Sequence, residues 1–173
     1  MCGIAGFITK VDTNSLVEKQ RTLANMCHAI RHRGPDNDGS WSDVKAGVWL
    51  GHQRLSVIDL SQAGNQPMQS PRGRYVIIFN GEIYNYPTLR KRLDGAGHHF
   101  KTDGDGETIL HLYEDLGPKC FEELNGMFSV AIWDGTRHRL ILARDRIGQK
   151  PLYYAFKNGR FVFASELKSL SKI

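Results

Sequence analysis

The chain opens with Met1-Cys2-Gly3-Ile4-Ala5-Gly6-Phe7, whose apolar residues predict a buried strand over residues 2–9. Removal of Met1 would leave Cys2 with both a thiol and a free α-amino group. A thiol has a pKa near ~8.5 and an α-amino group near ~7.7–8.0, so the amine can take the thiol proton near neutral pH. The pair would be a nucleophile that carries its own base. Taken alone, the cysteine is more simply explained as an accident of the chain terminus.

Composition predicts one domain over residues 1–173, with 40% hydrophobic and 24% charged residues. The three cysteines are sparse and odd in number, which predicts a reducing, cytoplasmic compartment without disulfides. No apolar run approaches the ~20 residues that cross a bilayer. The net charge of +5 comes from dispersed basic residues, so we expect neither a membrane nor a nucleic-acid partner. The seven histidines form no metal signature, and no metal is expected.

Periodicity predicts an α+β domain with a mostly antiparallel sheet and helices on the sheet faces. Asn158-Gly159 predicts a type I′ hairpin turn, and Thr13 or Asn14 is the candidate N-cap of the first helix. The predicted helices cover residues 14–31, 87–93 and 107–116. The predicted strands cover residues 2–9, 40–42, 46–52, 75–80, 127–133, 139–143, 151–156 and 160–164. Polar loops are expected at residues 31–39 and 61–73.

Three polar positions each allow a structural and a chemical interpretation. Arg54 precedes an apolar run and is either a surface arginine or a bidentate clamp for a carboxylate. Asn80-Gly81 follows a β-favouring run and is either a hairpin turn or a pair of oxyanion donors. The sequence after it, Glu82 to Tyr86, is not a clean return strand, which disfavours the hairpin. Asp105 precedes a predicted helix and either caps it or binds an ammonium group.

Motifs along the whole chain resemble those of the class II glutamine amidotransferase domain, an N-terminal nucleophile hydrolase, and most nearly that of glutamine-hydrolysing asparagine synthetases. Their occurrence in one order makes the resemblance specific. The motifs are MCGIAGF at 1–7, RHRGPD at 31–36, HQRLSVIDL at 52–60, QPM at 66–68, FNGEIYNY at 79–86, LNGMFSVAIWD at 124–134, RDRIGQKPLYY at 144–154 and FASELKSL at 163–170.

The resemblance implies a four-layer αββα sandwich of two antiparallel sheets, and a role for each matching residue. Cys2 would attack the glutamine side-chain amide and form a γ-glutamyl thioester, with its own α-amino group as base. Asn80 and Gly81 would form the oxyanion hole. Arg54 would hold the α-carboxylate of glutamine and Asp105 its α-amino group. The rest of the glutamine pocket would be formed by Leu55, Val57, Ile58 and Glu82.

The resemblance also implies a partner: a synthetase domain, not contained in residues 1–173, that accepts the ammonia. ATP and Mg²⁺ belong to that domain, so no cofactor is expected here, and a homodimer is compatible with the full-length enzyme. The match departs from the family at Gly104, where many relatives have serine. Two alternatives remain open. The domain could serve another ammonia acceptor, or it could be a non-catalytic glutamine-binding regulatory module if Met1 is retained.

Overall fold

The structure, a computed structural model, describes residues 1–11, 15–157 and 159–173. It contains two sheets in which every pairing is antiparallel. The first sheet has the order β2 (Asn37–Asp43), β3 (Val48–Arg54), β1 (Gly3–Ile8), β9 (Arg160–Ala164) and β8 (Tyr153–Lys157). The second has the order β4 (Met68–Gln69), β5 (Tyr75–Ile83), β6 (Gly126–Asp134) and β7 (Arg139–Arg144).

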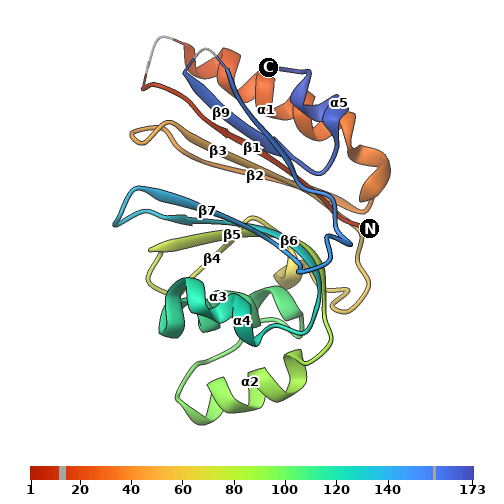
Figure 1. The fold of residues 1–173 in the computed structure, drawn as a ribbon, viewed down its shortest axis with the longest axis vertical. Helices are drawn as coiled ribbons and strands as arrows, with labels where there is room; N and C mark the ends of the chain where they lie inside the picture. The colour runs from red at the N-terminus through yellow and green to blue at the C-terminus, as the bar shows by residue number, and fades with distance from the viewer. Residues whose placement is uncertain (12–14, 158) are drawn as a thin grey trace.

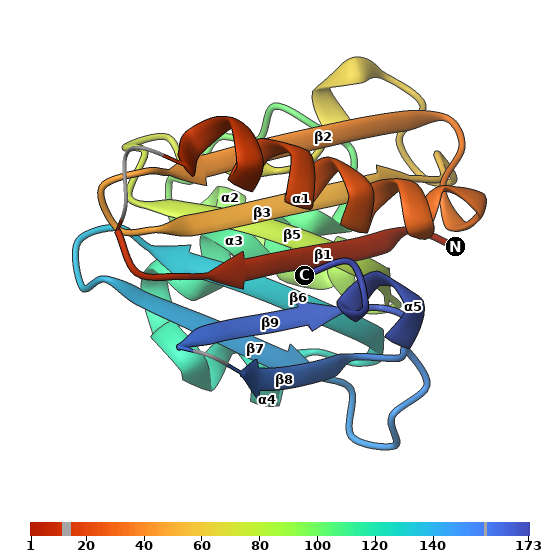
Figure 2. The same cartoon turned by 90° about the horizontal axis from the view of Figure 1, so that it is seen from above.

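The sheets lie face to face between two helical layers (Figure 1), which confirms the α+β class and the αββα arrangement. Helices α1 (Leu16–Ala29) and α5 (Leu167–Leu170) cover the outer face of the first sheet (Figure 2). Helices α2 (Tyr86–Gly95), α3 (Asp105–Leu116) and α4 (Cys120–Glu123) lie on the side of the second sheet. Short 3-10 turns occupy η2 (Arg31–Arg33), η3 (Gln62–Gly64) and η4 (Gly117–Lys119).

Strand β1 lies inside the first sheet, between β3 and β9, and is buried on both faces. Side chains along β1 alternate between its two faces, so Phe7 packs toward α1 and Ile4 toward the second sheet. The first glycine of β1 packs against Ile30, the C-cap residue of α1, since a Cβ at Gly3 would lie 2.9 Å from the Ile30 side chain. The close approach leaves little room for a side chain at this position.

Strand β5 is longer than predicted, because it continues through Asn80-Gly81 to Ile83 and pairs with β6 along its whole length. The hairpin interpretation of Asn80-Gly81 is therefore wrong. Alternation along β5 directs Ile78 into the space between the sheets and Phe79 toward the helices. Asn80 follows the parity of Ile78 and faces the first sheet.

Several element boundaries differ from the prediction. Strand β2 begins at Asn37, inside the predicted loop, and β3 extends to Arg54. The short elements β4, α4 and α5 had no periodic signal in the sequence because each has four residues or fewer. The predicted N-cap residues Thr13 and Asn14 lie outside the described residues, as does Asn158 of the predicted hairpin turn. Gly159 has the positive φ of 73° that favours glycine.

The three cysteines are free thiols, and Cys27 and Cys120 are buried. None of the helices in the described part of the chain combines the length and apolar character needed to cross a membrane.

Candidate active site

All nine residues predicted for the site line one cavity of about 250 Å³. It lies where the chain enters β1, leaves β3 and begins α3, beside the C-terminal half of β5. Met1, Asp59, Gly64, Gln66, Met68, Phe79, Thr102, Gly104, Gly106 and Lys150 complete its lining. A larger hollow of about 600 Å³, between α1 and strands β2 and β3, contains none of the nine.

The thiol of Cys2 is held against the backbone of Leu55, the first residue after β3. The N–H of Leu55 donates to Cys2 Sγ at 3.4 Å, and the thiol can donate to the Leu55 carbonyl at 3.5 Å. Burial raises the pKa of the Cys2 thiol, although the Leu55 N–H and the positive N-terminus partly offset this. The thiol is therefore protonated near neutral pH and needs a base in order to react.

The backbone at Cys2 is anchored by the RHRGPD motif. Arg33 Nε donates to the Cys2 carbonyl at 2.9 Å, while Arg33 Nη1 pairs with Glu166 at 3.0 Å. Asp36 accepts a 2.8 Å bond from the N–H of Ser56, which fixes the segment that leaves β3. Arg33 and Asp36 belong to the motif RHRGPD and Glu166 to the motif FASELKSL, and the sequence alone assigned neither motif a role. In the fold they hold the two backbone segments that meet at the thiol.

Arg54 ends β3 and is buried, so the interpretation as a free surface arginine is wrong. Its Nη1 donates to the Ser61 carbonyl and to Asn65 Oδ1, both at 2.7 Å, and its Nη2 donates to the Asp59 carbonyl. These bonds close the loop after β3 around the guanidinium. They use three of its five N–H donors, so Nε–H and one Nη2–H are not used by the described hydrogen bonds of Arg54.

The N–H of Gly81 is directed at the open edge of β5. The N–H groups two residues before and after Gly81 point to the same edge, and both are hydrogen-bonded. Phe79 N donates to Gln66 Oε1 at 2.6 Å, and Ile83 N donates to Asp105 Oδ2 at 2.9 Å. Opposite Gly81, Phe128 turns its own N–H and C=O to Asp145, away from β5. Strand β4 pairs only further back along β5. The Gly81 N–H therefore points at the cavity.

The side chain of Asn80 supplies a second donor at this place. Asn80 is 1% exposed, and its Nδ2 has no hydrogen-bond partner among the described residues. A buried amide without a partner costs about 1–3 kcal/mol, so a retained one calls for an explanation. A ligand oxygen in the cavity would provide the missing acceptor.

Asp105 begins α3 and faces β5. Its carboxylate accepts the N–H of Ile83, and the side chain is only slightly exposed. Burial raises the pKa of Asp105 to about 6, against the opposing effect of the Ile83 N–H, and the charge of Glu82 adds to the increase. The group is mostly ionised at pH 7 and gains from a cationic partner.

The remaining four predicted residues differ in exposure. Val57 is 62% and Ile58 40% exposed, and they belong to the loop that Arg54 closes. Leu55 and Glu82 are partly buried and lie deeper, beside the thiol and Asp105 respectively. Exposed apolar side chains at the mouth of a polar cavity would become covered when a ligand or a partner domain sits there.

Sequence analysis missed Lys150 as a cavity residue. It is buried, its N–H donates to Asp145 Oδ2 at 2.9 Å, and its Nζ lies 2.9 Å from the Met1 sulfur. The motif RIGQKPLYY contained it, but a lysine in a loop gives no sequence signal for burial. Asp59 was likewise missed. It joins the loop around Arg54 to the N–H of Asp103 at 3.0 Å, just before α3.

Two antiparallel sheets lie between two helical layers, with Cys2 at the entry to the inner strand β1, which gives the chain an αββα architecture. A sequence model of the glutamine amidotransferase domain matches residues 1–173. The chain therefore belongs to the class II glutamine amidotransferase domain family.

Comparison with curated relatives supports the same family assignment. The chain is 40% identical over 172 residues to asparagine synthetase [glutamine-hydrolyzing] 3 of Bacillus subtilis, covering 98% of this chain and 27% of that protein. It is 43% identical to asparagine synthetase [glutamine-hydrolyzing] 2 of the same organism, covering 22% of it. It is also 38% identical to Amidase chry2 of Gibberella zeae, covering 26% of that protein. The chain thus spans about a quarter of the length of these curated relatives.

A solved structure shares the fold at low sequence identity. Glutamine phosphoribosylpyrophosphate amidotransferase from B. subtilis superposes with a TM-score of 0.81 at 20% identity. The superposition covers 98% of this chain and 43% of that chain. At this identity the likeness supports the fold alone.

Proposed function

We propose that this domain hydrolyses glutamine to glutamate and ammonia, with Cys2 as the nucleophile once Met1 has been removed. The observation that carries the proposal is the convergence on one cavity of a thiol, a cation, an anion, the Asn80 amide, which has no acceptor among the described residues, and the Gly81 N–H at the open edge of β5. Free glutamine offers a matching set: a side-chain carbonyl, an α-carboxylate and an α-ammonium group.

Two buried charges select the substrate. The remaining donors of Arg54 bind the α-carboxylate, and the carboxylate of Asp105 binds the α-ammonium group. Because these charges are of opposite sign, they favour a free amino acid over an amide inside a peptide, which lacks both groups. Leu55, Val57, Ile58 and Glu82 enclose the rest of the ligand.

Thioester formation begins when the α-amino group of the mature Cys2 takes the thiol proton and Sγ attacks the amide carbon. The resulting oxyanion receives hydrogen bonds from Asn80 Nδ2, which has no partner among the described residues, and from the Gly81 N–H, which points at the cavity. Collapse of the tetrahedral intermediate breaks the C–N bond, and the α-ammonium group returns the proton to the leaving ammonia. Water, deprotonated by the same amine, then attacks the γ-glutamyl thioester and releases glutamate and the thiol.

In this proposal, a synthetase domain uses the ammonia. The support is that two relatives are asparagine synthetases, and that this chain spans only about a quarter of their length. ATP and Mg²⁺ would act in that domain, and the chemistry above uses no cofactor. A homodimer of the full-length enzyme and a cytoplasmic location complete the proposal, the latter supported by the free thiols of Cys27 and Cys120.

The experiment is a glutaminase assay of the chain and of Cys2→Ala and Cys2→Ser variants. Ammonia and glutamate should appear in equal amounts with the parent and fall to background with both variants. Hydrolysis by Cys2→Ala at the rate of the parent would contradict the proposal.

The alternative is that the ammonia goes to an acceptor other than aspartate. The observation in its favour is that one relative, Amidase chry2, is not named an asparagine synthetase. An assay of the full-length enzyme with aspartate and ATP distinguishes aspartate from another acceptor.

A further inference from the structure

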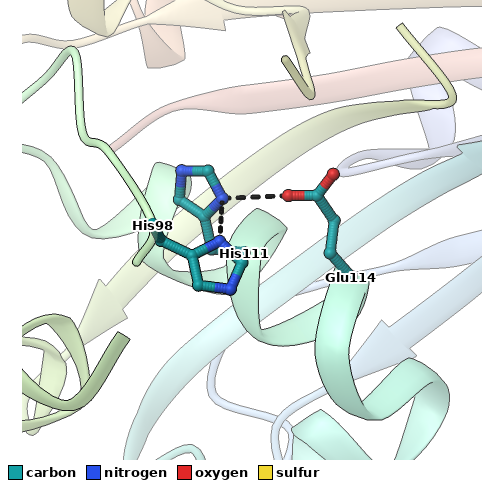
Figure 3. A group of neighbouring side chains, drawn as sticks. All are labelled: His98, His111 and Glu114. Carbon is teal, nitrogen blue, oxygen red and sulfur yellow. Dashed lines mark hydrogen bonds and ion pairs between the residues drawn. The ribbon is translucent and has the colours of Figure 1, made fainter. Parts of the chain in front are cut away.

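A second cluster of polar side chains lies on the far side of α3 from β5. Figure 3 shows His98, His111 and Glu114 with their ligand atoms directed at one another. His98 Nδ1 lies 3.0 Å from His111 Nδ1, which lies 2.9 Å from Glu114 Oε2. All three atoms lie within 4.8 Å of one another. We propose that these residues bind a divalent transition metal ion of the zinc type.

Hydrogen bonding alone does not satisfy this cluster. The ring nitrogen Nδ1 of His111 carries either one proton or one lone pair, so it cannot make a full hydrogen bond to both neighbours. A metal ion placed between the three atoms accepts a lone pair from each of them. Bonds of about 2.0–2.1 Å at tetrahedral angles separate ligand atoms by about 3.3 Å, a few tenths more than the two observed distances.

Each histidine also has a carboxylate at its other ring nitrogen. Asp115 lies 3.0 Å from His98 Nε2, and Glu107 lies 3.7 Å from His111 Nε2, which is buried and has no hydrogen-bond partner among the described residues. A carboxylate that accepts a hydrogen bond from a metal-binding imidazole orients the ring and makes it more basic, which Asp115 can do for His98. Three carboxylates around two imidazoles also give the cluster a negative potential that favours a cation.

The donor set indicates the class of ion. Two imidazole nitrogens and one carboxylate oxygen suit Zn²⁺, Co²⁺ and Ni²⁺, whereas Mg²⁺ and Ca²⁺ prefer oxygen ligands alone. The side chains of His98 and Glu114 are 18% and 21% exposed, so an ion can enter from solvent and keep a water ligand. His111 is 2% exposed and forms the inner wall.

The role that follows is structural. His111 and Glu114 lie on one face of α3, while His98 belongs to the connection before it, so an ion would fix that connection to the helix. The same connection leads through Thr102 and Gly104 to Asp105, which line the candidate active site. Sequence analysis found no metal signature because the two histidines lie 13 positions apart in different elements.

The test is titration of the untagged full chain with Co²⁺ and Zn²⁺, carried out in a Cys2→Ala background so that no thiol at the N-terminus can chelate the metal together with the amine. We expect one Co²⁺ per chain, with visible d–d bands and a raised melting temperature, and displacement by Zn²⁺. His98→Gln and Glu114→Gln should each weaken binding more than Asp115→Asn does, because each changes a direct ligand of the ion. Asp115→Asn should weaken it ~10–100-fold.

His99→Ala is the matched control, because His99 is the exposed neighbour of His98, and it should bind as the parent does. His98 and Glu114 are changed rather than His111 because they are partly exposed, and circular dichroism of each variant checks its fold. The proposal is overturned if the parent binds no Co²⁺ in a 1:1 ratio. It is equally overturned if His98→Gln and Glu114→Gln bind with the affinity of the parent.

Discussion

The thiol of Cys2 and the backbone of Leu55 face each other across 53 positions of sequence, with the Leu55 N–H 3.4 Å from Sγ and the Leu55 carbonyl 3.5 Å from it. Among the described residues, no imidazole or carboxylate makes a hydrogen bond to this thiol. Since burial raises the pKa of the thiol, a base is needed, and the α-amino group of Cys2, once it is free, can serve as that base. Removal of Met1 is thus the chemical condition for the proposed reaction.

Replacement of Asn80 by alanine should lower kcat for glutamine hydrolysis ~10²–10³-fold with little change in KM, because an oxyanion donor acts mainly in the transition state. The fold should lose little stability, since Asn80 Nδ2 bonds to no other described group. Steady-state kinetics and thermal unfolding measure the two effects.

Asn85→Ala is the control for this prediction. The Asn85 amide donates to the Glu123 carbonyl at 3.0 Å and accepts the N–H of Asn125 at 2.9 Å. Its loss should lower the melting temperature and leave kcat nearly unchanged. Equal kcat in Asn80→Ala and the parent would remove Asn80 from the oxyanion hole.

Replacement of Arg54 by lysine should raise KM for glutamine by ~10-fold or more and change kcat less. Lysine retains the charge but cannot both close the loop and bind a carboxylate with two parallel bonds. Arg74→Lys breaks a comparable two-point contact with Asp134, away from the cavity, and should leave KM unchanged. An unchanged KM in Arg54→Lys would show that the α-carboxylate binds elsewhere.

Replacement of Asp105 by asparagine should raise both KM for glutamine and the stability of the unliganded fold at pH 7. Burial raises the pKa of this carboxyl to about 6 from about 3.8, so the native state binds the proton more tightly than the unfolded chain does. The contribution of protonated Asp105 to the free energy of unfolding is complete below about pH 3.8, and it is lost as the pH rises through about 6. The ionised form costs at most about 3 kcal/mol at pH 7.

Urea unfolding of Asp105→Asn at pH 7 and at pH 4 measures this dependence. The stabilisation should be present at pH 7 and absent at pH 4, because asparagine retains an acceptor for the Ile83 N–H. Asp103→Asn is the control, since the side chain of Asp103 is 94% exposed, and it should show neither effect. The same difference from the parent at both pH values would refute the assigned cause.

Replacement of Gly104 by serine should stabilise the start of α3. Gly104 is the N-cap residue and makes no side-chain cap, and its φ of −82° suits any residue. An added Cβ would lie 3.7 Å from Thr102 Oγ1, an ordinary contact. We expect a gain of about 0.5–1.5 kcal/mol from capping and reduced chain entropy. Gly104→Ala is the control without a hydroxyl and should be less stable than Gly104→Ser, because alanine is a poor N-cap residue; if serine gives no more than alanine, the hydroxyl does not cap the helix.

Local pattern was enough to predict the elements that carry strong periodicity, among them β1, β6, α3 and the antiparallel pairing of the last strands. It could not predict that Arg54 is buried or that β5 passes through Asn80-Gly81, because tertiary packing decides both. The carbonyl groups that hold Arg54 come from a loop without a periodic signal. The resemblance assigned the nine cavity residues their places, whereas Lys150 and the pair of Arg33 and Glu166 emerged only from long-range contacts.

The most direct test of the central claim is the intact mass of the chain before and after incubation with a diazo-ketone analogue of glutamine. We expect a mass that lacks Met1 and, after incubation, one covalent adduct that peptide mapping assigns to Cys2. Cys2→Ala should form no adduct. A chain that retains Met1 and still hydrolyses glutamine would refute Cys2 as an N-terminal nucleophile, as would equal adduct formation in the parent and in Cys2→Ala.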